Sequence, residues 1–229
     1  SADIRGIEER TDGLLDEILN ELKEAEIAKV VTQGLNPDVK MKDSGISWIG
    51  MIPEHWDIRR LSQVSYEHYI SNKQVHHQNL LSLSYGRIVR KDINATEGLL
   101  PASFDTYQIV EEGNIVLRLT DLQNDHKSLR VGLVKEEGIV TSAYVCLGVN
   151  NSIVPTYLYN VLHSYDIKKL FYSMGGGLRQ NLNWQGLRKL DIPHPPIAEQ
   201  QAIVAYIDEK CSKITSLISE LESEIDYLI

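Results

Sequence analysis

The C-terminal stretch of the chain constrains its fold more than any other. From residue 204 onward, apolar residues recur in alternating steps of three and four, which is the spacing of a heptad seam. Glu199 places negative charge in the first helical turn, where the helix dipole favours it. The seam consists of Val204, Ile207, Cys211, Ile214, Ile218, Leu221, Ile225 and Leu228. So narrow a stripe predicts a long helix over residues 198–229 that pairs with another long helix, whereas an ordinary amphipathic helix would carry a wider apolar face.

A second long amphipathic helix is predicted over residues 1–35. Thr11 or Asp12 suits its N-cap. Gly34 suits the position just after the helix, and Pro37 prevents its continuation. Its three-four repeat is carried by Leu15, Ile18, Leu22 and Ala25. This helix is a plausible partner for the C-terminal one.

The residues between these helices, 36–197, predict a globular domain of mixed helices and strands. Residues 36–56 show no regular pattern, but Trp48 and Trp56 are too apolar for a free linker, so we expect an extended segment pinned to the domain. A helix is expected over residues 154–173. Strands are expected at Leu80–Leu83, Tyr85–Val89, Gln108–Val110, Ile115–Leu119, Val131–Val134 and Thr141–Leu147. The predicted fold class is therefore α+β, with a mixed α/β domain flanked by long helices that form coiled coils.

Charge divides the chain in the same way. Residues 1–40 carry 5 basic and 10 acidic side chains, residues 198–229 carry 2 and 7, and residues 41–197 carry 16 and 15. The near-neutral centre permits either a basic DNA-binding face or an evenly solvated surface. The sequence has no apolar run of membrane-spanning length, and it begins without a signal-peptide core. With two isolated cysteines, Cys146 and Cys211, this composition indicates a cytoplasmic protein.

Motifs that carry catalysis are missing from the sequence. It holds no phosphate-binding loop, no nucleophile elbow, no H-E-x-x-H and no C-x-x-C. Asp125-His126-Lys127 is a bare D-x-K triplet, which is common by chance. We therefore expect a binding module with no catalytic residues, no metal ligands and no cofactor of its own.

Three clusters of polar side chains are candidates for contact with nucleic acid. They lie at residues 85–91, in the loop 117–130 and in the glycine-rich segment 175–183. Arginine, asparagine and glutamine read base edges, and lysine and arginine hold phosphates. Each cluster alone is better explained as an ordinary polar turn, and only the presence of three clusters in one near-neutral domain brings the two interpretations closer to balance. The candidate DNA-binding residues are Tyr85, Arg87, Arg90, Lys91, Arg118, Thr120, Gln123, Asn124, Lys127, Arg130, Arg179, Gln180 and Asn181.

Several passages resemble the specificity subunits of type I restriction–modification enzymes. KDSGISWIGMIPEHW at residues 42–56 resembles the opening of a specificity-subunit repeat, and RLTDLQND at 118–125 resembles one version of the family's recognition domains. NLNWQGLRKLDIPHPPIAEQQAIVAYIDEK at 181–210 resembles the passage from recognition domain into conserved helix. AEIAKVVTQGLNPDV at 25–39 resembles the end of the conserved helix that precedes a second recognition domain.

The resemblance implies that residues 36–197 form one target recognition domain, which reads one half of a bipartite site in double-stranded DNA. Full-length members have two such domains, so this chain carries half of the pattern, as a natural half-subunit or an excised half. In this family S-adenosylmethionine and adenine methylation belong to the modification subunit, and translocation and cleavage belong to the restriction subunit.

We therefore expect a non-catalytic specificity subunit that docks modification subunits through its helices. We also expect two copies to pair their helices as a homodimer and to read an inverted repeat. The alternative is a coiled-coil interaction or decoy protein, which binds the modification subunit without directing methylation.

Overall fold

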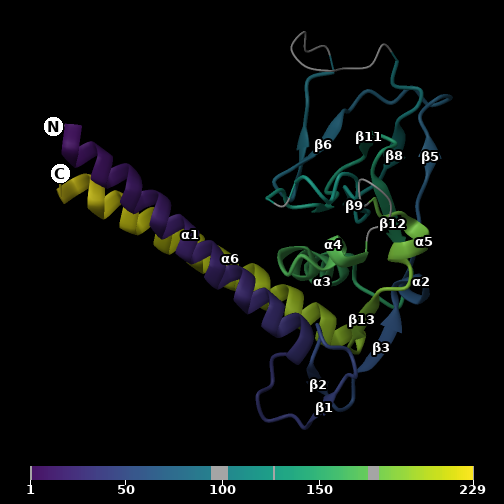
Figure 1. The fold of residues 1–229 in the computed structure, drawn as a ribbon, viewed down its shortest axis with the longest axis horizontal. Coiled ribbons are helices and arrows are strands. Elements are labelled where there is room, and N and C mark those ends of the chain that lie inside the picture. Colours follow the sequence, from purple (N-terminus) through teal and green to yellow (C-terminus); the bar gives the residue numbers. More distant parts are fainter. Residues whose placement is uncertain (1, 94–102, 126, 175–180, 229) are drawn as a thin grey trace.

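The structure, a computed structural model, describes residues 2–228 apart from 94–102, 126 and 175–180. Two long helices, α1 (Ala2–Gln33) and α6 (Ile197–Leu228), run side by side in opposite directions. Their free ends lie next to each other, far from a mixed domain of strands and short helices at the opposite end (Figure 1). Among the described helices, none is long and apolar enough to cross a membrane. The α+β fold class expected from the sequence is confirmed.

The strands of the domain form two larger sheets and three strand pairs. The first sheet has the antiparallel order β10 (Val131–Leu133), β9 (Ile115–Leu117), β12 (Val145–Val149), β4 (Ser65–Glu67). The second has the order β11 (Gly138–Val140), β8 (Gln108–Val110), β5 (Ile70–Ser71). The pairs are β1 (Met41–Asp43) with β2 (Met51–Pro53), β3 (Asp57–Arg60) with β13 (Asp191–His194), and β6 (Leu81–Ser84) with β7 (Arg87–Arg90).

Four short helices complete the domain: α2 (Leu61–Val64), α3 (Pro155–Ile167), α4 (Leu170–Met174) and α5 (Trp184–Leu187). Helix α3 is the centre of the main core, because its buried tyrosines tie three parts of the chain together. The hydroxyl of Tyr157 lies 3.0 Å from the carbonyl oxygen of Val31 and 3.1 Å from that of Pro193. The hydroxyl of Tyr165 donates to the carbonyl oxygen of Asp191 at 2.9 Å. The domain ends of α1 and α6 are therefore built into the core of the domain.

The two long helices contact each other, so the expected pairing of the two is present, whereas the coiled coil stays a prediction. The Tyr206 hydroxyl donates to Glu26 at 2.6 Å, and the Lys23 ammonium donates to Thr215 at 3.3 Å. Of the predicted seam, Ile207 is buried and three residues are half-buried, namely Val204, Cys211 and Ile214. The side chains of Ile218, Ile225 and Leu228 lie outside the described part.

Leu221 departs from the predicted seam, because its side chain is 41% exposed. Two helices cover only one side of each other, and toward their free ends no third element lies against them in Figure 1. The predicted N-cap at Thr11 or Asp12 is also wrong, since α1 already begins at Ala2. The predicted end is confirmed: Gly34 has φ +73° and donates its N–H to the carbonyl oxygen of Val30 at 3.0 Å.

The segment 36–56 is more regular than expected. It holds the β1–β2 hairpin, in which Met41 faces Pro53 and Asp43 faces Met51. The expectation that it is pinned by tryptophans is confirmed, because Trp56 is fully buried and Trp48 packs against the main core. The indole N–H of Trp56 donates to Glu199 in the first turn of α6 at 2.9 Å.

Most of the other predicted elements exist with shifted bounds. The predicted strand Tyr85–Val89 begins only at Arg87, because Tyr85 and Gly86 form a turn. The predicted helix 154–173 is broken at Lys169, whose φ of +59° separates α3 from α4. Strands β3, β4, β5 and β11 were not predicted. They are two to four residues long, too short to show a periodic pattern.

Candidate nucleic-acid interface

The loop between β9 and β10, residues 118–130, is organised around a buried arginine. The side chain of Arg130 is 0% exposed, and its guanidinium points into the loop that it closes. It donates to the carbonyl oxygens of Arg118 at 3.1 Å and Thr120 at 2.9 Å, and also to those of Asp121 and Asp125. Because an arginine presents five donors in a rigid fork, one side chain fixes four carbonyl groups of an irregular loop.

The prediction that Arg130 contacts DNA is therefore wrong. A side chain with no exposed surface, whose donors face protein carbonyls and the Tyr172 hydroxyl, cannot reach a phosphate or a base. The sequence pattern indicated a polar loop with an arginine in it but could not give the direction of the arginine side chain. Arg130 instead stabilises the conformation of the loop from its buried side.

Tyr172, which the sequence analysis did not single out, supports this arginine from α4. Its hydroxyl accepts from Nε of Arg130 at 3.0 Å and donates to the carbonyl oxygen of Asp125 at 3.0 Å. The guanidinium carbon also lies 5.2 Å from the centre of the tyrosine ring, within the range of a cation–π interaction. The sequence carried no signal for this role, because Tyr172 reads as one more apolar residue of the predicted helix.

The pKa values of two carboxyl groups near Arg130 are shifted in opposite directions. Hydrogen bonds from Ser128 lower the pKa of Asp125 to about 2. Asp166 lies in α3, where burial raises the pKa of its carboxyl to about 6, although its Oδ2 accepts from the backbone N–H of Arg130. The other oxygen, Oδ1, is buried with no hydrogen-bond partner. Asp166 is thus the carboxylate whose charge the fold accommodates poorly.

We predict that Asp166 weakens the fold as the pH rises. A carboxyl whose pKa is raised on folding favours the folded state while it is protonated, and that contribution is lost between the unfolded pKa near 4 and the folded pKa near 6. The free energy of unfolding should fall by on the order of 2–3 kcal/mol over this pH range. Urea unfolding at pH 4.5 and 7.5 of the wild type and Asp166→Asn measures it. The wild type should lose stability relative to the variant over this range, and parallel curves would contradict the assignment.

The second candidate segment lies directly against this loop. The side-chain oxygen of Asn181 accepts the backbone N–H of Asp121 at 2.9 Å, and the N–H of Leu182 donates to the carbonyl oxygen of Leu119 at 2.9 Å. Asn181 therefore lies beside the loop, with one polar group already used to hold it. Arg179 and Gln180 lie outside the described residues, so their assignment stays a prediction.

The third cluster, on the β6–β7 hairpin, also meets the loop, at Leu129. A side chain at Gly86 would come within 3.0 Å of Cβ of Leu129, so the hairpin turn is in close contact there. Tyr85 and Arg87 are exposed beside this contact. Arg90 and Lys91 stand at the other end of the hairpin, and Arg90 is already paired with Glu136 at 2.8 Å.

The remaining predicted residues are on the outer surface of the loop. Gln123, Asn124 and Lys127 are exposed, while Arg118 and Thr120 are half-exposed. Asn124 donates to the carboxylate of Asp121 at 2.7 Å, and Arg118 lies 3.9 Å from that of Asp125. Parts of three sequence clusters thus converge on one surface, which we call the loop face: residues 118–125 and 127–129, Asn181 and the hairpin turn 84–87.

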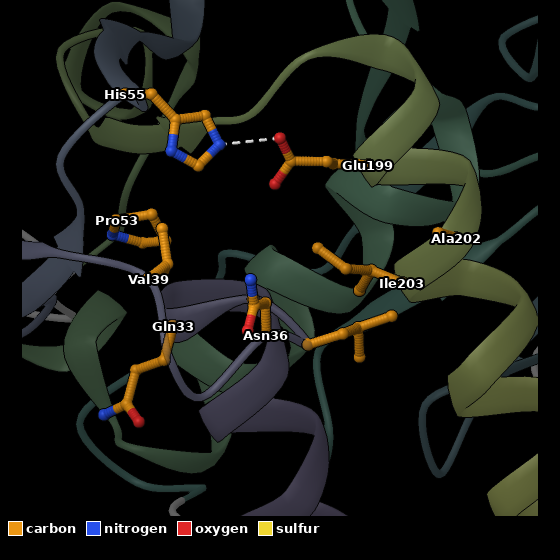
Figure 2. A pocket seen from close by; sticks show the side chains of 10 residues that line it. Gln33, Asn36, Val39, Pro53, His55, Glu199, Ala202 and Ile203 are labelled. Atoms are coloured by element: carbon orange, nitrogen blue, oxygen red, sulfur yellow. Dashed lines mark hydrogen bonds and ion pairs between the residues drawn. The ribbon is translucent and has the colours of Figure 1, made fainter.

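Two hollows of the described structure lie beside the long helices. A cavity of about 220 Å³ lies where the helix pair meets the β1–β2 hairpin (Figure 2). Its walls are mainly apolar, and Nε2 of His55 lies within hydrogen-bond distance of the Glu199 carboxylate, at 2.6 Å, at its edge. Among the residues that the structure describes, no cluster of histidine, cysteine and carboxylate side chains could hold a metal ion. A wider cleft of about 560 Å³ separates the hairpin turn from α1, α3 and α6.

Comparison with known proteins places the chain in a family. The sequence model of the type I restriction modification DNA specificity domain matches residues 103–227. The chain therefore belongs to the family of type I restriction–modification specificity subunits. No curated protein matches the sequence.

Solved structures share the fold. One comes from work on complex assembly and conformational transition of the type I R-M system; it has 15% sequence identity and a TM-score of 0.64. Another is the HsdS subunit from Thermoanaerobacter tengcongensis, with 16% identity and a TM-score of 0.54. Each match covers 99% of this chain and 54% of the other, so the chain spans about half the length of these structures.

Proposed function

We propose that this chain recognises a specific sequence in double-stranded DNA through the loop face. One observation carries the proposal: three segments that lie far apart in sequence meet on one surface, and a buried arginine fixes its central loop. A loop held in one shape loses little conformational entropy on binding, which favours specific contacts. Arg118, Asn124 and Lys127 supply the donors and acceptors that base edges and phosphates require.

We further propose that the chain itself is non-catalytic and directs a methyltransferase. Membership of the specificity-subunit family supports a division of labour, in which a modification subunit binds S-adenosylmethionine and methylates adenine, and a restriction subunit joins the same complex. The acidic helices α1 and α6 are the candidate docking elements. In this arrangement the chain reads one half of a bipartite site.

We also propose a homodimer, which fewer residues support than the sequence alone suggested. Within one chain α1 already covers part of the seam of α6 that motivated it. Four apolar side chains in the middle of α1 and the outer half of α6 nevertheless stay between 41% and 56% exposed, namely Ile18, Leu22, Leu217 and Leu221. They support a further helical partner, which a second copy would supply. Light scattering at tens of micromolar tests this, and a monomer would contradict it.

We predict that Lys127→Ala weakens DNA binding equally for all sequences. Lys127 is exposed on the loop and is the type of residue that contacts phosphates. Its loss should reduce the slope of log affinity against log salt concentration by about 1. Fluorescence anisotropy on a duplex selected from a random pool measures both quantities. Lys40→Ala is the matched control, because Lys40 is exposed and directly precedes β1, which lies at the opposite end of the domain from β6 in Figure 1. Equal binding by both variants and the wild type would contradict the proposed surface.

A further inference from the structure

Tyr85 occupies a backbone position that its side chain does not suit. Ser84 pairs with Arg87 at the end of the β6–β7 hairpin, so the turn consists of Tyr85 and Gly86 alone. Both have positive φ, +47° and +74°, as a type I′ turn requires. Asparagine followed by glycine is the favoured pair in such a turn, whereas a bulky residue with positive φ is strained.

Contacts within the chain do not offset this strain. The Tyr85 side chain is 84% exposed, more than any other large apolar or aromatic residue in the part of the chain described. Its hydroxyl and ring find no hydrogen-bond or ring partner among the described residues. A strained conformation that brings no packing in return is typical of a functional position.

The turn is also held firmly in place. A Cβ at Gly86 would lie 3.0 Å from Cβ and 3.1 Å from Cδ1 of Leu129, so the turn lies closely on the β9–β10 loop. Further along the hairpin, Leu83 and Ile88 approach Gly132 of β10 closely enough to exclude a side chain there. Tyr85 therefore stands at a fixed position beside the loop rather than on a free tip.

We propose that Tyr85 is a specificity-determining residue, which the hairpin inserts into the major groove of DNA so that its ring packs against base edges. The major groove admits a two-stranded ribbon, and apolar groups there recognise the methyl group of thymine. Arg87, exposed beside the turn, supplies a positive charge for the flanking phosphates. This inference rests on the proposed DNA recognition and adds an element of the chain that contacts bases by apolar packing.

Substitution at Tyr85 should move stability and binding in opposite directions. Tyr85→Asn creates the favoured Asn-Gly turn, so the melting temperature should rise by about 1–3 °C. Affinity for a duplex selected from a pool of random sequences by the wild-type chain should fall about tenfold or more. Tyr85→Phe, which keeps the ring, should bind within about threefold of the wild type. The salt dependence should not change, because tyrosine carries no charge to a phosphate.

The experiment compares these variants with Tyr69→Asn, whose tyrosine is 61% exposed elsewhere on the domain. A repeated selection with Tyr85→Asn should lose base preference at one position of each half-site and keep the rest. Wild-type affinity of Tyr85→Asn, or a lower melting temperature, would overturn the inference. If Tyr85→Asn binds normally while Lys127→Ala does not, DNA recognition stands without this contact. If the wild type selects no sequence, the proposed function itself fails.

Discussion

Replacing Arg130 by methionine should lower the free energy of unfolding by about 3–5 kcal/mol. The substitution keeps much of the side-chain volume but leaves four carbonyl oxygens of the loop and the Tyr172 hydroxyl without their donor. Each buried polar group that loses its partner costs about 1–3 kcal/mol, and the loop can recover part of this by admitting water. The effect should be large because one side chain satisfies so many groups.

Urea denaturation of Arg130→Met measures this loss, and Arg118→Met is the matched control. Arg118 lies in the same loop, but its side chain is half-exposed and its nearest carboxylate is 3.9 Å away. Such a surface pair contributes about 0–1 kcal/mol. A loss below about 1 kcal/mol for Arg130→Met, or equal losses for both variants, would show that the guanidinium does not hold the loop.

Trp56→Ala should destabilise the chain by a similar amount, about 3–5 kcal/mol. Trp56 is fully buried where the end of α1, the β1–β2 hairpin and the start of α6 meet. Its ring lies against Gly34, whose Cβ position is 3.1 Å from the indole, and its N–H donates to Glu199. Removing the ring leaves a large cavity at the joint between the helix pair and the domain, and it takes from the Glu199 carboxylate one of its two partners, the other being His55.

Two further variants separate the parts of this effect. Trp184→Ala removes a partly buried indole from the edge of the same core and should cost clearly less. Glu199→Gln keeps an acceptor for the indole and removes a charge that is partly exposed beside His55 and the N-terminus of α6, so it should cost about 0–1 kcal/mol. Thermal unfolding followed by circular dichroism ranks the stabilities of Trp56→Ala, Trp184→Ala and Glu199→Gln. If Trp56→Ala were no worse than Trp184→Ala, the joint would not depend on this ring.

The sequence predicted the parts of the fold that repeat or end in a recognisable way. The seam from Val204 onward predicted a long helix and its pairing, and Gly34 predicted where the first helix ends. Both signals are local, because helix periodicity and left-handed caps depend on a few neighbouring residues. The short strands β4 and β5 have no such signal, since two or three residues cannot show an alternation.

For the candidate site too, the sequence predicted what depends on local residue type and missed what depends on the folded structure. Residue type and clustering located the loop 118–130 and its two neighbours, and all three meet in the structure where they are described. The direction of a side chain was beyond the pattern: Arg118 and Arg130 look alike in sequence, yet one is half-exposed and the other fully buried. Burial of Arg130 depends on carbonyl groups that converge only after an irregular loop has folded.

Methylation mapping tests the central proposal most directly. The chain is expressed with its modification subunit in a host that lacks other adenine methyltransferases, and genomic N6-methyladenine is sequenced. We expect one motif with two inverted, identical half-sites around a fixed spacer, and a changed motif for Tyr85→Asn. Absence of methylation, although the purified chain and modification subunit form a complex, would contradict sequence recognition by this chain and indicate a decoy.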